Sequence, residues 1–341
     1  MKRVSVIIPT CNRLGFLRTA LKSVESQTAR DAILEVVVVE NSGRPDSKSV
    51  CIEFPKMPIT YIFRDPPLKP ENAGRDLLSQ GRGEFTAILC DDDWWDPLHI
   101  QAALEAFDVN IGLVGVYCGY FPVRSEADRL HCVSGSFVPW FASSTPIRKD
   151  LWTLTCRDMV VSCLIATGFH YSTLVVCSSI LRKCLHIYDY GNPYDTDRML
   201  SFELAKLGPV GCCRTPRVYC REHSGQETRR VELFEEARHW FSNSTERILK
   251  YAFDNGIDLE NEFQSRAAIK GIPLVELLNH SNHETMRTLV QSGRLGTEVQ
   301  DLAAMSDRKR RTRDWIPPNF LRYLKKISKF LNKHSDRSSC A

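Results

Sequence analysis

Residues 83–97 read GEFTAILCDDDWWDP, an apolar segment that runs directly into three aspartates. Residues 85–89 have the length and composition of a strand that is buried on both faces. Three carboxylates at the end of a buried strand repel one another, which raises their pKa values unless positive charge lies beside them. A divalent ion such as Mg²⁺ prefers carboxylate oxygens and often shares its coordination shell with substrate phosphates. The stretch therefore predicts a metal site at the end of this strand.

A helix cap is the alternative explanation for the aspartates. Asp is a favoured residue at the start of a helix, and Pro97 marks a helix start nearby. One capping Asp explains only one of the three residues, however. The bulky pair Trp94 and Trp95 is also hard to reconcile with an ordinary surface turn. A metal site accounts for more of the stretch than a helix cap does, and on these residues alone both interpretations stay open.

The chain around this stretch alternates between strand and helix patterns. Short apolar runs predict further strands at residues 4–8, 33–39 and 59–63. Helical spacing or character is found after residue 14 and at residues 46–54, 71–79 and 97–107. This alternation predicts a mainly parallel sheet flanked by helices, and ligands of such sheets bind beyond the carboxyl ends of the strands. From residue 111 to 221 the strands shorten, which favours antiparallel additions, and after residue 226 the pattern is helical.

Composition sets broader limits. With 341 residues, 43% hydrophobic and 25% charged, the chain is a folded protein of about two domains. Its 13 cysteines are odd in number and none are spaced as C-x-x-C, so we expect buried free thiols rather than disulfides or structural zinc. The apolar run at residues 4–8 is too short for a signal-peptide core, and no run approaches about 18 apolar residues. We therefore expect a cytoplasmic protein.

The loop after the first strand also excludes two kinds of phosphate site. It reads PTCNRLG from Pro9 to Gly15. A P-loop requires Gly-x-x-x-x-Gly-Lys-Ser/Thr, and a dinucleotide fold requires Gly-x-Gly-x-x-Gly at this point. Neither motif is present, so a nucleotide would have to be held in another way.

Three segments in the right order resemble the family-2 glycosyltransferases, which are nucleotide-sugar enzymes of the GT-A fold. They are residues 4–13 with the following Leu17 and Leu21, residues 35–42, and residues 83–97, and together they cover about residues 1–107. The resemblance implies an α/β, Rossmann-like, mainly parallel sheet flanked by helices, with a C-terminal helical extension. The predicted division is a GT-A domain at 1–226, with a nucleotide-sugar half at 1–107 and an acceptor half at 108–226, then a helical region at 227–306 and a basic amphipathic tail at 307–341.

The resemblance also implies roles for individual residues. The residues expected to bind the nucleotide-sugar are Pro9, Thr10, Glu40, Arg75, Asp91 and Asp93, and those expected at the metal are Asp92 and His223. Asp91 would lie by the ribose, and Asp93 would support the site. Glu40 stands where the family usually has an Asp that binds the base. For Glu40 an exposed strand end, and for Arg75 and His223 an ordinary surface position, are the alternatives.

An inverting transfer needs a base that deprotonates the acceptor hydroxyl. The segment YDTDRMLSFELA, from Tyr194 to Ala205, is similar to the family's Glu-Asp-x-Asp segment at the start of a helix. The aligned base is Asp195, and the departure is Tyr194, where the family usually has an acidic residue. Helix capping is the alternative for Asp195 and Asp197.

The resemblance therefore predicts an inverting, Mn²⁺- or Mg²⁺-dependent glycosyltransferase. It would move a sugar from a nucleotide-sugar, expected to be a UDP-sugar, to an acceptor hydroxyl in cell-surface polysaccharide or glycoconjugate synthesis. A non-catalytic nucleotide-sugar or glycan-binding protein of the same fold is the alternative, and it would have no use for a base. A lipid-surface scaffold dominated by the tail is a third possibility.

The tail at residues 307–341 carries 11 Lys and Arg against three Asp, so the preceding 306 residues have a net charge of −4 within the total of +4. Apolar residues fall on one helical stripe with basic residues mostly off it. Such a helix is expected either to contact an anionic membrane, which would place the protein at its inner face near a lipid-linked acceptor, or to pack on the body. The acidic body argues against a nucleic-acid partner.

Overall fold

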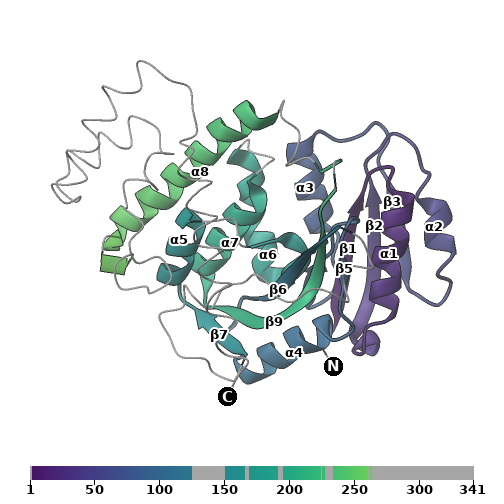
Figure 1. The fold of residues 1–341 in the computed structure, drawn as a ribbon, viewed down its shortest axis with the longest axis horizontal. Coiled ribbons are helices and arrows are strands. Elements are labelled where there is room, and N and C mark those ends of the chain that lie inside the picture. The colour runs from purple at the N-terminus through teal and green to yellow at the C-terminus, as the bar shows by residue number, and fades with distance from the viewer. Residues whose placement is uncertain are drawn as a thin grey trace. The chain divides into compact units, whose positions relative to one another are not determined.

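The computed structural model describes residues 2–124, 150–165, 169–190, 195–223, 225–226, 233–259 and 261–262 (Figure 1). These residues belong to one compact unit. The predicted basic tail and the predicted helices beyond residue 262 lie outside the described residues. Among the helices that the structure describes, none is both long enough and apolar enough to cross a membrane.

The first half of the chain forms the four parallel strands that its apolar runs predict. They are β1 (Val4–Thr10), β2 (Ile33–Glu40), β3 (Ile59–Phe63) and β4 (Phe85–Ile88), in the order β3-β2-β1-β4. β1 and β2 are buried on both faces along almost their whole length. Thr10 lies opposite Glu40 in the register, so these strands end at the same edge.

Helices flank these strands as expected, with small differences in their bounds. They are α1 (Leu14–Glu25), the 3-10 turn η1 (Arg30–Ala32), α2 (Lys48–Ile52), α3 (Pro70–Ser79) and α4 (His99–Val109). α1 places Leu17, Ala20, Leu21 and Val24 in the same buried cluster as alternate residues of β1 and β2. α4 begins two residues later than its pattern predicts. A turn precedes it, in which the Asp96 side chain accepts from the Leu98 amide and the Asp96 carbonyl accepts from the His99 amide.

The second half extends the same sheet. β8 (Leu174–Cys177) is antiparallel to β4 and to β6 (Gly115–Val123), which confirms the predicted antiparallel additions. β9 (Val210–Arg221) runs parallel to β6, and the short strands β5 (Trp94–Trp95) and β7 (Leu151–Leu154) are antiparallel to β9. Within the described ranges the sheet has nine strands, in the order β3-β2-β1-β4-β8-β6-β9-β5 with β7 also on β9.

The remaining helices lie on the second half of the sheet (Figure 1). They are α5 (Cys156–Ile165), α6 (Ser178–Cys184), α7 (Thr196–Leu207) and α8 (Leu233–Asp254), with 3-10 segments η4 (Tyr171–Thr173) and η5 (Leu185–Tyr190). α5 packs against α7 and α8, and α6 packs against α7. Most of the described cysteines are buried free thiols, as expected, whereas Cys11 is exposed.

Two glycines offer a matched test of this packing. A Cβ on Gly83 would lie 2.7 Å from the Ser5 amide nitrogen and 2.8 Å from the Arg3 carbonyl oxygen, whereas a Cβ on Gly15, in α1, meets nothing within 4 Å. We expect Gly83→Ala to lower the free energy of unfolding by about 1–3 kcal/mol, because backbone atoms must move. Gly15→Ala should raise it by about 0.5–1 kcal/mol through helix propensity. Urea denaturation measures both, and equal effects of the two substitutions would contradict this packing.

Candidate functional site

Polar side chains meet where β1 and β4 end. The Thr10 hydroxyl, at the last position of β1, donates to Oδ2 of Asp91 over 2.9 Å. The two residues are 81 positions apart in the chain, and the parallel pairing of β1 with β4 brings them together. Thr10 and the aspartate triplet of residues 91–93 therefore form one cluster at the carboxyl edge of the sheet.

The aspartates of the triplet differ in their surroundings. Asp91 is 4% exposed and Asp93 is 2% exposed, while Asp92 is more open to solvent. Burial raises the pKa of Asp91 to about 6, although the Arg13 guanidinium acts in the opposite direction. Burial also raises the pKa of Asp93. Ionised carboxylates at these positions are therefore costly unless a cation compensates them.

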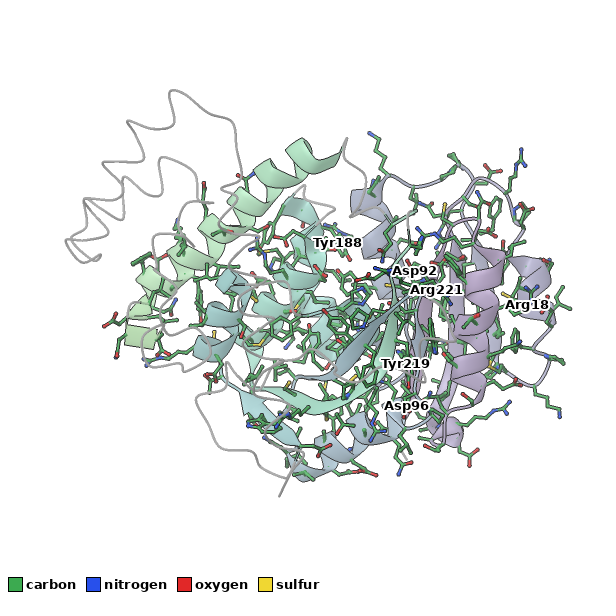
Figure 2. All side chains as sticks on the ribbon, viewed as in Figure 1. Arg18, Asp92, Asp96, Tyr188, Tyr219 and Arg221 are labelled. Atoms are coloured by element: carbon green, nitrogen blue, oxygen red, sulfur yellow. The ribbon has the colours of Figure 1, made fainter. Side chains whose placement is uncertain are left out.

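β9 brings a second set of side chains to the triplet from about 130 residues away. β5 pairs with β9, and Trp94 stacks on Tyr219 with ring centroids 5.3 Å apart. The Arg221 amide donates to Oδ1 of Asp93 over 3.0 Å, and its Nε donates to the Asp92 carbonyl over 3.1 Å. Figure 2 shows Asp92 and Arg221 close together. The buried Trp pair is thus the strand that attaches the triplet to β9.

Arg221 and His223 are fixed by aromatic contacts. The Arg221 guanidinium lies 4.5 Å from the ring centre of Phe16 and 4.7 Å from that of Trp94. The His223 ring packs against Phe16 at 5.0 Å, and its Nε2 lies 3.0 Å from Oδ2 of Asp92. Asp92 and His223, both expected at the metal, are therefore in direct contact.

Arg13 contributes a second guanidinium to the cluster. Its Nη1 lies 3.0 Å from Oδ1 of Asp91 and 3.1 Å from Oδ2 of Asp92. A cation thus contacts Asp92, the carboxylate expected at the metal, as well as Asp91. The Asp92 carboxylate and the His223 imidazole form a donor pair that suits Mn²⁺, and the carboxylate also suits Mg²⁺. The residues present therefore fit the metal that the family resemblance implies.

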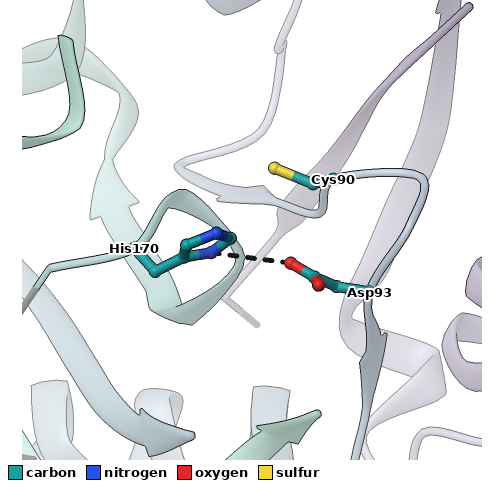
Figure 3. A group of neighbouring side chains, drawn as sticks. All are labelled: Cys90, Asp93 and His170. Atoms are coloured by element: carbon teal, nitrogen blue, oxygen red, sulfur yellow. Dashed lines mark ion pairs between the residues drawn. The ribbon is translucent and has the colours of Figure 1, made fainter. Parts of the chain in front are cut away.

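Cys90, Asp93 and His170 form a neighbouring cluster (Figure 3), with one ligand atom from each residue within 4.8 Å of the others. Asp93 is already bonded to the Ser172 hydroxyl and the Arg221 amide, and His170 Nδ1 lies 3.5 Å from it. Burial and the nearby aspartates raise the pKa of the Cys90 thiol well above its usual range. A protonated thiol is a poor ligand for a hard ion. Asp93 therefore links β9 to η4 through its hydrogen bonds to Arg221 and Ser172.

Glu40, which was expected to bind the base, is fully buried. Its carboxylate accepts from the Ser47 amide at 3.0 Å, from the Ser47 and Ser42 hydroxyls at 2.8 and 3.0 Å, and from the Tyr61 hydroxyl. These contacts exclude the alternative of an exposed strand end. They also show Glu40 holding the loop at residues 41–47, with its oxygens already occupied by protein donors.

Pro9 and Arg75 are the remaining residues expected at the nucleotide. Pro9 is half-buried in β1, opposite Val39. Arg75 lies on α3 and forms an ion pair with Asp189, which lies in η5. Both partners are well exposed. Any role of Arg75 at a diphosphate would require this surface pair to open.

Asp195 lies immediately before α7 and is fully buried. Its oxygens accept from Nε of Arg198 at 2.9 and 3.0 Å, and its side chain makes no cap hydrogen bond to the helix, which removes capping as its explanation. Burial raises the pKa of Asp195 to about 6 against the opposing effect of Arg198. Asp197 is half-buried as a residue, and its Oδ1 accepts from the Arg198 amide over 2.8 Å in the first turn of α7. Burial of the carboxyl raises the pKa of Asp197, and nearby His170 partly offsets the rise.

Arg13 and Ser172 are among the contributors to this site that were not singled out from the sequence. Arg13 lies in the loop after β1, so the rule that ligands bind beyond strand ends was a sufficient signal for it. Ser172 donates to Asp93 and accepts from the Cys90 amide, but an isolated serine in η4 carries no pattern that marks it.

The pKa of Asp91 predicts a pH effect on stability. A carboxyl whose pKa is raised on folding holds its proton more tightly in the folded chain, so its contribution to stability is lost as pH rises from about 4 through about 6. We expect the free energy of unfolding of the wild-type chain to fall relative to that of Asp91→Asn by up to about 3 kcal/mol over this window. Urea denaturation in EDTA at several pH values measures the difference. Parallel curves for the two proteins would show that Asp91 titrates normally.

Comparison with known proteins identifies relatives among the glycosyltransferases. The model of glycosyl transferase family 2 matches residues 5–165. An uncharacterized glycosyltransferase of Rickettsia prowazekii is 23% identical over 231 residues, which is 66% of this chain and 65% of that protein. The chain therefore spans slightly less than two thirds of the length of this relative. A Campylobacter jejuni GalNAc(5)-diNAcBac-PP-undecaprenol beta-1,3-glucosyltransferase is 36% identical over 96 residues, or 27% of this chain and 30% of that enzyme.

Solved structures show the same fold. S. aureus TarS 1-349 in complex with UDP-GlcNAc has a TM-score of 0.55 at 14% identity, covering 92% of this chain and 93% of that one. The mannosyltransferase PcManGT from Pyrobaculum calidifontis, in complex with GDP-Man and Mn2+, has a TM-score of 0.50 at 15% identity, covering 96% and 84%. The sheet is arranged as in these GT-A proteins, and residues 5–165, just under half of the chain, form a glycosyl transferase family 2 domain.

Proposed function

We propose that the protein is an inverting, metal-dependent glycosyltransferase that moves a sugar from a nucleotide-sugar, a UDP-sugar by preference, to an acceptor hydroxyl. One observation carries this proposal: Asp91, Asp92 and His223 converge at the carboxyl edge of the sheet with Arg13 and Arg221 beside them. Carboxylates alone would repel a diphosphate. Carboxylates that lie beside arginines and a metal-compatible imidazole can bind a diphosphate through a bound metal ion.

The donor would lie across the ends of β1 and β4. Thr10 and Asp91 would contact the ribose side, with Pro9 beside them, and Glu40 would act on the base through the loop that it holds. Asp92 and His223 would hold Mn²⁺ or Mg²⁺, which supplies positive charge to the departing diphosphate. The guanidinium of Arg221 packs against the rings of Phe16 and Trp94 and is already ordered. It therefore loses less side-chain entropy on binding a diphosphate than an exposed arginine does.

The solved relatives support a nucleotide-sugar and a metal, because one was crystallised with UDP-GlcNAc and another with GDP-Man and Mn2+. We propose a glycan or lipid-linked acceptor in polysaccharide or glycoconjugate synthesis. The Campylobacter relative, whose name specifies an undecaprenol-linked substrate, supports a lipid-linked acceptor. Contact of the basic tail at residues 307–341 with the inner face of a membrane stays a prediction.

The base would come from the start of α7. Asp195 is the residue that the family resemblance assigns, and its raised pKa of about 6 is suited to accepting a proton near neutral pH. Arg198 would have to release one carboxylate oxygen when the acceptor binds. Asp197, in the same turn, offers a second carboxylate if Arg198 does not release Asp195.

The pairing of Asp195 with Arg198 also favours a second candidate function. A non-catalytic nucleotide-sugar or glycan-binding protein needs the triplet but no base, and an aspartate that is fully engaged with an arginine is compatible with a purely structural role. The two functions predict the same donor binding and differ in turnover.

Donor binding tests the proposal directly. A panel of nucleotide-sugars with Mn²⁺ or Mg²⁺ should include a UDP-sugar that raises the melting temperature only when the metal is present. Asp92→Asn should remove this metal-dependent shift, because it deletes one ligand and leaves the fold intact. Asp108→Asn is a matched control, since Asp108 is an exposed carboxylate paired with Lys2 on the surface. No response to any nucleotide-sugar with either metal would contradict the proposal.

Turnover of the α7 variants tests the assignment of the base. Asp195→Asn should lower kcat by about 10²- to 10⁴-fold and leave donor affinity within a few-fold, because a base acts on the acceptor. Asp197→Asn, measured beside it, should retain most of the activity. A larger loss of kcat in Asp197→Asn than in Asp195→Asn would assign the base to Asp197. Because Asp195→Asn also breaks a buried ion pair, the folded fraction of each variant is measured by circular dichroism. Metal-dependent donor binding without turnover against a panel of acceptors would favour the binding protein.

A further inference from the structure

Arg13 occupies an unusual position. It lies directly before α1, in a loop where Asn12 has the left-handed backbone angle φ of 56°. This turn directs the arginine toward the triplet, where one nitrogen, Nη1, contacts both Asp91 and Asp92. The arginine therefore contacts Asp92, the carboxylate that the metal would use.

The two cations would compete for one particular atom. Oδ2 of Asp92 lies 3.1 Å from Arg13 Nη1 and 3.0 Å from His223 Nε2. An ion bound between Asp92 and His223 needs that oxygen within about 2.0–2.3 Å, and it would then lie too close to a guanidinium of the same charge. Arg13 must move for the metal to bind there.

The neighbouring arginine shows why Arg13 is the group that moves. Arg221 is 8% exposed, stacks between Phe16 and Trp94, and bonds to the Asp92 carbonyl. The Arg13 side chain is 29% exposed and its contacts to the triplet are made by one nitrogen of a long side chain. The Arg13 guanidinium is partly open to solvent and can turn to a diphosphate, for which its planar fork of donors is well suited.

From this geometry we infer that Arg13 occupies the metal position while no donor is bound and moves to the donor diphosphate when the nucleotide arrives. The inference rests on the proposed function and adds a regulation of the same site. The nucleotide then does two things for the metal: it offers phosphate oxygens, and it removes a competing cation. Metal and nucleotide binding are therefore coupled through Arg13, and the coupling must be equal in both directions.

Manganese binding to the full chain without nucleotide tests the inference, with free Mn²⁺ measured by electron paramagnetic resonance. Arg13→Ala should bind Mn²⁺ at least about fivefold more tightly than wild type, the lower end of common coupling between sites. Arg13→Gln should behave in the same way, and Arg13→Lys, which keeps the charge, should stay close to wild type. Arg18→Ala is the matched control, because Arg18 is on α1, pairs with exposed Glu53, and lies away from Asp92 (Figure 2).

Nucleotide binding provides the second measurement. In EDTA, Arg13→Ala should bind UDP more weakly than wild type by isothermal titration calorimetry, and the gain in Mn²⁺ affinity on adding UDP should be smaller than in wild type. Unchanged or weaker Mn²⁺ binding by both Arg13→Ala and Arg13→Gln without nucleotide would overturn the inference. Failure of the proposed function is distinguishable, because it would appear as the absence of UDP and UDP-sugar binding in wild type itself.

Discussion

The structure depends on how three adjacent carboxylates are kept at the end of a buried strand. Asp91 and Asp93 are almost fully buried, and burial raises the pKa of both, so their negative charge is costly without compensation. Each aspartate has different partners: Thr10 and Arg13 for Asp91, Arg13 and His223 for Asp92, Ser172 and Arg221 for Asp93. This division leaves Asp92 as the member of the triplet that is most accessible to an ion.

The sheet explains how these partners reach the triplet. The parallel pairing of β1 and β4 places Thr10 and the loop that carries Arg13 on one side. The two-residue strand β5 then binds the triplet to β9, so that the end of β9 delivers Arg221 and His223 on the other side. A site whose halves are held by strand pairing changes little in shape when charge is added or removed, which is the preorganisation that transfer of a charged leaving group requires. Within it, the Arg13 side chain is the part best placed to respond to a ligand.

Much of this arrangement could be predicted from the sequence, for physical reasons that differ from element to element. β1 to β4 are short apolar runs, of which all but the partly exposed β3 are largely buried, so composition identifies them, and the contacts of Thr10 follow from their parallel order. The pairing of β5 with β9 was not predicted because two residues show no periodicity. The hydrogen bonds that occupy the Glu40 carboxylate were not predicted either, since the donors Ser47 and Tyr61 come from two other segments. The contact of His223 with Asp92 rested on the family resemblance alone, and Arg198 beside Asp195 had no signal in the pattern.

We propose that Asp92 and His223 hold a divalent ion against the diphosphate of a nucleotide-sugar. A crystal structure of the chain grown with UDP and Mn²⁺, with anomalous scattering collected at the manganese edge, would locate the ion. We expect a single strong anomalous peak within coordination distance of the Asp92 carboxylate, the His223 imidazole and the UDP phosphates. A peak among Cys90, Asp93 and His170 instead, or bound UDP with no manganese beside Asp92, would contradict it.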